Sequence, residues 1–117
     1  MILSVLTFDL RPGSLEALEE AFTRHRIFER AIQTEGCRSL YLASGSADGS
    51  RAHVIGVWDD EAAYQRWLDH PEREVGSEEI HAIASDEWDP SAPGEIWRVL
   101  HSAQSTVTPA TPVSARP

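Results

Sequence analysis

Two hydrophobic periods alternate along the chain, and their order is the feature that most constrains the fold. Four segments alternate apolar and polar side chains with a period of two residues, which is typical of β-strands with one buried face. These strand segments are residues 2–10, 37–43, 52–58 and 95–102. Between them lie stretches in which apolar residues recur at the spacing of amphipathic helices. The order β-α-β-β-α-β predicts an α+β fold, a ferredoxin-like four-stranded antiparallel sheet with helices on one face.

The first helix is predicted over residues 15–34. Ser14 stands at its N-terminal cap position, and Gly36 supplies a stop beyond its C-terminus. The expected inner face has helical spacing and consists of Leu18, Ala21, Phe22, His25, Phe28 and Ile32. Because His25 is the one histidine inside this apolar stripe, it is expected to point inward.

A second helical region follows the third strand. Asp59 or Asp60 is expected to cap a short helix that Pro71 ends. One side of this helix carries Ala63, Tyr64, Trp67 and Leu68. A further helix is predicted over about residues 72–84, but Gly76 interrupts it and its apolar residues are few. Its intrinsic stability is therefore low.

A single domain is expected over residues 1–102. The chain has 117 residues, which is about the typical length of one domain. Residues 103–117 contain three prolines, many Ser and Thr, and only Val107 and Val113 as sizeable apolar side chains. Because so little apolar surface cannot offset the entropy of ordering, these residues are predicted to be a disordered C-terminal tail.

Charge and composition argue against several classes of function. The formal net charge is −9 and no basic stripe occurs, so nucleic-acid binding is not expected. No apolar run approaches the ~18 residues needed to cross a bilayer, so no membrane partner is expected. Scattered histidines and the single Cys37 offer no metal-ligand spacing, and no glycine-rich nucleotide motif is present. We therefore expect a cytoplasmic protein with no cofactor and no metal.

One face of the predicted sheet has no element to cover it. The helices cover one side, while the other side also carries large apolar residues such as Leu3, Val5, Trp97 and Val99 or their neighbours. The chain offers no further element for this second face. A second copy of the same sheet, packed face to face, is the simplest solution. The sequence therefore predicts a homodimer.

Three short motifs carry a resemblance to a known family. They are Pro12-Gly13-Ser14 after the first strand, Glu35-Gly36-Cys37 before the second, and Val57-Trp58-Asp59-Asp60-Glu61-Ala62-Ala63-Tyr64 at the end of the third. The last motif continues into Trp67-Leu68 and a proline. With the element order, these motifs make residues 1–102 similar to the antibiotic biosynthesis monooxygenases. The resemblance implies a dimeric α/β barrel with a pocket between helices and sheet.

This resemblance also implies an activity. Members oxidise phenolic polyketides with O2 and without metal or flavin, so it implies a cofactor-independent monooxygenase that oxidises an aromatic polyketide-like phenol or anthrone in a secondary-metabolite pathway. Trp58 and Tyr64 match a tryptophan and a tyrosine of the anthrone-oxidising members, whose asparagine is replaced here by Val54. In the haem-degrading members the matching set would be Leu6, Trp67 and Ser77, of which only the tryptophan is retained.

The candidate site residues follow from these patterns. His25 is the expected general base, because a neutral imidazole accepts a phenol proton, and Tyr64 and Trp67 complete the catalytic set. The predicted substrate-binding residues are Trp58, Phe22, Tyr41, His81 and Trp88. The expected partners are a small aromatic substrate, O2 and a second copy of the chain. The alternatives are a non-redox cyclase or isomerase with the same base, a haem-degrading oxygenase, and a non-catalytic ligand-binding dimer.

Overall fold

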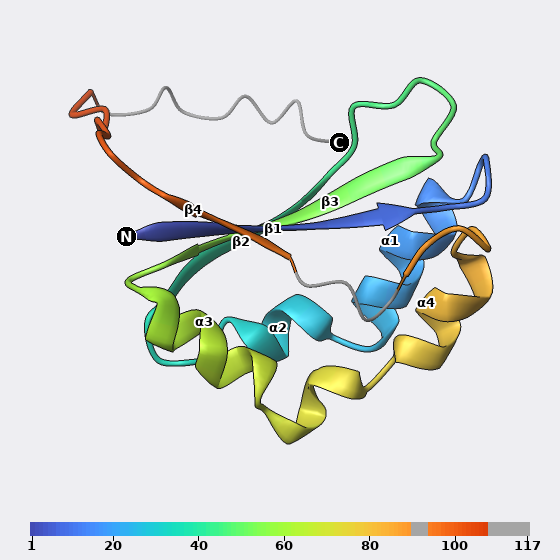
Figure 1. The fold of residues 1–117 in the computed structure, drawn as a ribbon, viewed down its shortest axis with the longest axis horizontal. Helices are drawn as coiled ribbons and strands as arrows, with labels where there is room; N and C mark the ends of the chain where they lie inside the picture. Colours follow the sequence, from blue (N-terminus) through green and yellow to red (C-terminus); the bar gives the residue numbers. More distant parts are fainter. Residues whose placement is uncertain (90–93, 108–117) are drawn as a thin grey trace.

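The computed structural model describes residues 1–89 and 94–107. In chain order its elements are the strand β1 (Ile2–Asp9), the helices α1 (Leu15–Arg24) and α2 (Ile27–Ala31), the strands β2 (Cys37–Ala43) and β3 (Arg51–Trp58), the helix α3 (Glu61–Leu68), the 3₁₀ helix η1 (Pro71–Glu74), the helix α4 (Ser77–Ile83) and the strand β4 (Glu95–Arg98). All the helices lie on one side of the sheet (Figure 1). The predicted α+β, ferredoxin-like fold is confirmed.

Pairing between the strands determines which residues share a face of the sheet. The strand order is β2-β3-β1-β4, and each neighbouring pair is antiparallel. Val5 pairs with Ile55, which in turn pairs with Tyr41, so these three side chains share the face that carries no helix. The alternate residues of β1, including Ser4 and Phe8, point toward the helices. The sheet thus has one covered face and one open face.

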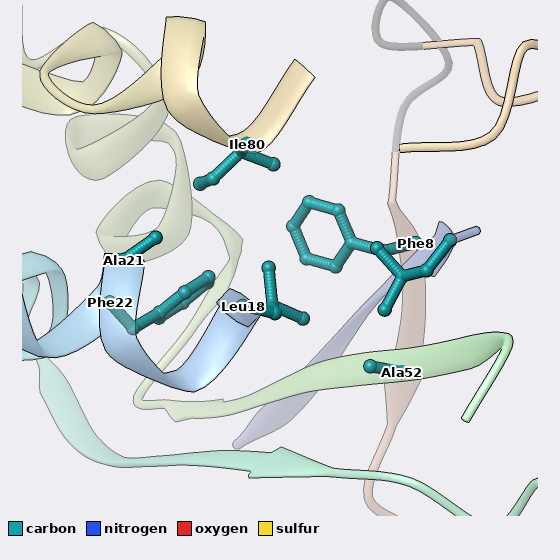
Figure 2. Close-up of a cluster of buried hydrophobic side chains, with 7 residues drawn as sticks. Phe8, Leu18, Ala21, Phe22, Ala52 and Ile80 are labelled. Carbon is teal, nitrogen blue, oxygen red and sulfur yellow. The ribbon is translucent and has the colours of Figure 1, made fainter. Parts of the chain in front are cut away.

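Side chains from both layers form the larger of two buried clusters. Leu18, Ala21 and Phe22 on α1 meet Phe8 on β1 (Figure 2). Leu10, Ala52 and Ile80 complete the group. The second cluster lies around α3 and consists of Ile2, Ala31, Trp58, Ala63, Tyr64 and Trp67. The two clusters hold α1 and α3 against opposite ends of the sheet, and a cavity lies between them.

The prediction of one helix over residues 15–34 is wrong. Helix α1 ends at Arg24, and Arg26 takes a left-handed backbone conformation with φ 50° before α2 begins. The guanidinium of Arg30 donates a hydrogen bond of 3.1 Å to the backbone carbonyl of His25. This bond satisfies a carbonyl oxygen at the end of α1, so the helix ends without a glycine. Ser14 lies at the N-terminal cap position but makes no capping hydrogen bond with its side chain.

The second helical region also differs from its prediction. Of the two aspartates predicted to cap α3, Asp60 is the one that does so. Its carboxylate accepts a hydrogen bond of 2.9 Å from the backbone amide of Ala63. The single helix expected over 72–84 is instead the pair η1 and α4. Gly76 separates them with φ 91°, a conformation that favours glycine.

The last strand is shorter than predicted. β4 ends at Arg98, whereas alternation favoured a strand as far as Ser102. Arg98 pairs with Ile2, and the amide of Val99 donates to the carbonyl of Met1 at 3.1 Å. Of the predicted tail, residues 103–107 are exposed and residues 108–117 lie outside the described part of the chain.

Candidate active site

A cavity of about 160 Å³ lies between the sheet and the helices. Ser4, Leu6 and Phe8 of β1 form its floor, because alternate residues of a strand point to one side. Ser4 and Phe8 are four residues apart, so the floor is roughly 13 Å long at 3.3 Å per strand residue. The helices and η1 supply the roof with Phe22, Phe28, Tyr64, Trp67, Arg73 and His81, among others.

One end of the cavity carries a buried group of polar atoms. The indole N–H of Trp58 donates to the hydroxyl of Ser4 at 3.0 Å, and both residues are almost completely buried. The phenol of Tyr64 lies near the Ser4 hydroxyl, close enough for this hydroxyl to act on the pKa of the phenol. The rings of Trp58 and Tyr64 contact each other with centroids 5.2 Å apart. We call Ser4, Trp58 and Tyr64 the polar triad.

Burial determines the protonation state of the phenol. The pKa of Tyr64 is raised above its ordinary value because the buried site disfavours the phenolate, and the charge of Arg73 and the nearby Ser4 hydroxyl oppose this effect only in part. Tyr64 is therefore neutral near pH 7. A neutral phenol in this position has a proton to donate to an oxygen atom of a ligand.

The opposite end of the cavity is aromatic. Phe8 contacts Trp88 with ring centroids 5.2 Å apart, and His81 contacts the same indole edge-to-face at 5.5 Å. The indole N–H of Trp88 donates to the backbone carbonyl of Thr7 at 2.9 Å, which fixes the ring in this place. His81 is exposed at the cavity mouth. An imidazole here has access both to a ligand and to solvent.

Six of the eight predicted site residues line this cavity. They are Phe22, Trp58, Tyr64, Trp67, His81 and Trp88. Tyr41 lies on the open face of the sheet and is 55% exposed, because its neighbours Leu40 and Leu42 take the face toward the helices. His25 also lies outside the cavity, at the C-terminal end of α1.

His25 connects α1 to α4. Its Nε2 lies 2.8 Å from a carboxylate oxygen of Glu79, and the same carboxylate forms an ion pair with Arg24. The imidazole also packs closely under Gly76, where an added Cβ would lie 2.8 Å from the His25 ring. Arg30 donates from its guanidinium to backbone carbonyls of the same segment. These contacts fix the position of the residues 73–81 that roof the cavity.

Replacing Glu79 by Gln should lower the melting temperature in a pH-dependent way. Hydrogen bonds from Arg24 and then His25 hold the pKa of the Glu79 carboxylate below its ordinary 4.5. A carboxylate with a depressed folded-state pKa stabilises the fold above its unfolded pKa, and this contribution disappears as pH falls through the folded value. Thermal unfolding of both proteins should show a Tm difference at pH 7 that shrinks below pH 4.5.

Glu87→Gln is the matched control for this measurement. Glu87 is exposed and no ion pair involves it in the described residues, so this variant should melt like the wild type at every pH. If the Tm difference of Glu79→Gln stayed constant down to pH 2, the carboxylate charge would not be its cause.

Ser4 and Arg73 are cavity residues that the sequence patterns did not single out. Ser4 is polar within the otherwise apolar series Ile2, Leu6 and Phe8 of the helix-facing side of β1, and this interruption was a usable signal. No such signal existed for Arg73, because the sequence pattern predicted that it lies within a single helix over about residues 72–84.

Other features of the described residues narrow the chemistry. Burial raises the pKa of the Cys37 thiol to about 11, so this cysteine is a poor nucleophile. Within residues 1–89 and 94–107, no three His, Cys, Asp or Glu side chains are placed to hold a metal ion. No described helix is long and apolar enough to cross a membrane.

Comparison with known proteins identifies the family. The profile of the antibiotic biosynthesis monooxygenases matches residues 1–78. This match covers most of the chain and includes the floor and most of the roof of the cavity. The protein belongs to the antibiotic biosynthesis monooxygenase family. A search of curated proteins found no significant match.

Solved structures agree on the fold. SnoaB from Streptomyces nogalater, a cofactor-independent oxygenase solved as a variant, superposes with a TM-score of 0.69 at 16% identity, covering 89% of this chain and 97% of SnoaB. The haem-degrading protein Rv3592 from Mycobacterium tuberculosis superposes with a TM-score of 0.58 at 16% identity, covering 88% of this chain and 98% of Rv3592. PA3566 from Pseudomonas aeruginosa superposes with a TM-score of 0.60 at 21% identity, covering 84% of this chain and 93% of PA3566. At these identities the similarity establishes the fold alone.

Proposed function

We propose that the protein is a cofactor-independent monooxygenase that oxidises an aromatic, polyketide-like phenol with O2 in a secondary-metabolite pathway. The observation that supports this proposal is the cavity, in which aromatic walls end at the neutral, buried phenol of Tyr64. Such a site binds a flat ring by apolar contact and its oxygen substituent by a hydrogen bond. SnoaB, with the same fold, is a cofactor-independent oxygenase.

The chemistry required of the protein is limited. A phenol that has lost its proton is electron-rich enough to pass an electron to O2, and the overall reaction converts phenol and O2 to quinone and water. Tyr64 donates a hydrogen bond to the substrate oxygen, and the apolar walls exclude water from the reactive intermediate. His81, at the mouth, is the cavity imidazole that accepts the substrate proton. It takes the role that the sequence patterns assigned to His25.

The described residues of the cavity offer no oriented axial ligand for haem. His81 is the imidazole that lines the cavity, but its ring contacts Trp88 and no hydrogen bond in the described residues directs it at the centre of the cavity. We therefore do not carry over the activity of the haem-degrading neighbour.

Oxygen uptake tests the proposed function. Purified protein should consume one O2 for each molecule of an anthrone oxidised to its quinone, with a chelator present and no cofactor added. His81→Ala should lose most of this activity, while His25→Ala should keep the activity at temperatures where it is folded. Turnover without O2 uptake would refute the oxygenase and assign the site to a non-redox cyclase or isomerase, in which Tyr64 would stabilise an enolate.

We also propose that the protein is a homodimer through the open face of its sheet. The face without helices carries the apolar side chains of Leu3, Val5, Tyr41, Ile55, Val57 and Trp97, and Tyr41 and Trp97 are more than half exposed. A contiguous apolar face of this kind is typical of an interface. The same strands of each subunit would form the interface, and a twofold axis would relate the two subunits.

Val5→Glu should convert the dimer to a monomer. It places a charge at the centre of the open face, where burial against a second sheet would cost several kcal/mol. Sedimentation velocity should give twice the chain mass for the wild type and the chain mass for the variant. Ile32→Glu makes the same change on the helix side, where Ile32 is 43% exposed, and should remain dimeric. A monomeric wild type at micromolar concentration would refute the dimer.

A further inference from the structure

Arg73 differs from three other arginines of the chain in what its guanidinium contacts. Arg30 and Arg66 donate to backbone carbonyl oxygens, and Arg38 forms two hydrogen bonds with the carboxylate of Asp59. Their donors thus serve the fold. Arg73 instead lines the cavity, and its side chain is only 35% exposed.

Within the described residues, Arg73 has one weak ionic partner. Its Nη1 lies 3.9 Å from a carboxylate oxygen of the neighbouring Glu74, whose side chain is 77% exposed. An ion pair at this distance and with this exposure contributes little to the stability of the fold. A guanidinium carries five N–H donors, which remain available to an acceptor in the cavity. The cavity therefore presents a cation whose donors the described side chains leave largely unused.

The position of this cation is the polar end of the cavity. Arg73, Tyr64 and Ser4 all line the cavity, and Arg73 lies close enough to Tyr64 for its charge to act on the phenol. The lining also contains the polar side chains of Glu74, Ser77 and His81, while most of the remaining residues, such as Leu6 and Phe22, are apolar. The site is thus complementary to a flat apolar body with an anionic group at one end.

We propose that Arg73 binds the carboxylate of an aromatic acid, and that aromatic carboxylic acids are the ligand class of this cavity. The planar fork of a guanidinium matches the two oxygens of a carboxylate, which a single phenolate oxygen cannot do. The chain has a net charge of −9, so anion binding here must arise from a local cation. That this ligand is the substrate rests on the proposed function.

Calorimetric titration with a matched pair of ligands tests the proposal. 4-Hydroxybenzoate and 4-hydroxybenzamide have the same shape and differ in charge. The wild type should bind the benzoate at least tenfold more tightly, as a charge-assisted hydrogen bond provides about that factor. Arg73→Gln should reduce the preference to about one, and Arg73→Lys should keep part of it. Arg66→Gln, a charge removal outside the cavity, should leave it unchanged.

Three outcomes would overturn the proposal. They are equal affinities of the wild type for the two ligands, a preference that survives in Arg73→Gln, and no measurable binding of either ligand. The wild-type comparison decides the matter even if Arg73→Gln does not fold, and Arg73→Lys provides a second folded variant. Because the titration is done without O2, a protein that prefers the benzoate but consumes no O2 would refute the oxygenase and retain the ligand class.

Discussion

Trp58→Ala will be less stable than the wild type by about 3–5 kcal/mol, the usual cost of truncating a buried large aromatic residue. Trp58 is 1% exposed and belongs to the cluster that holds α3 against the sheet. Its loss would remove the contact with Tyr64 and leave the buried hydroxyl of Ser4 without its indole donor. Denaturant unfolding, analysed by linear extrapolation, measures this difference.

Two further variants separate packing from hydrogen bonding at this position. Trp58→Phe keeps an aromatic ring and removes the indole N–H, so it should cost less than Trp58→Ala. Gly56→Ala keeps the indole but adds a Cβ that would lie 2.8 Å from the Ser4 hydroxyl and nearer still to the indole nitrogen. It should therefore also destabilise the protein. A loss below about 1 kcal/mol for Trp58→Ala would show that this residue does not organise the cluster.

The strands were predictable because their information is local. In β1 and β3 the side chains that face the helices alternate with those that do not, and this period is visible in the residues themselves. The end of β4 was not predictable, because it depends on pairing with a strand almost a hundred positions earlier in the chain. Alternation continues to Ser102 in the sequence, but alternation alone does not show where the pairing between two strands ends.

The placement of His25 failed for a related reason. On a continuous helix, residue 25 would share the inner face with Leu18 and Phe22. The helix ends at Arg24, because Arg30 binds the carbonyl of His25 and Arg26 adopts a left-handed conformation. Neither glycine nor proline marks this break, and the contacts that stabilise it come from tertiary structure. His25 therefore leaves the inner face and binds Glu79.

Most of the candidate site could be predicted, because the apolar faces of the amphipathic helices and of the sheet pack against each other and their residues meet there. Trp58, Tyr64 and Trp67 were found in this way and by resemblance. Arg73 was not, because it lies on η1 and its position depends on the turn at Gly76. Polar residues that reach a cavity from irregular segments are not part of a periodic sequence pattern, so only the structure reveals them.

Tyr64→Phe should lower kcat on a phenolic substrate by about 10²–10³-fold, the usual cost of removing one hydrogen-bond donor to a developing oxyanion. The substitution removes a single oxygen and keeps the ring packed against Trp58, so the fold should persist. Tyr41→Phe is the matched control, because Tyr41 is the other tyrosine of the chain and lies on the open face. It should retain the wild-type rate. Steady-state O2 consumption by the three proteins measures the difference.

The pH dependence of the wild type provides a second readout of the same role. Because burial raises the pKa of Tyr64 above its ordinary 10.0, the phenol should keep its proton and the activity should persist beyond pH 10. If Tyr64 acted instead as a phenolate base, activity would rise with pH through its pKa and Tyr64→Phe would abolish that rise. Equal rates for Tyr64→Phe and the wild type would exclude both roles and leave Tyr64 as a packing residue.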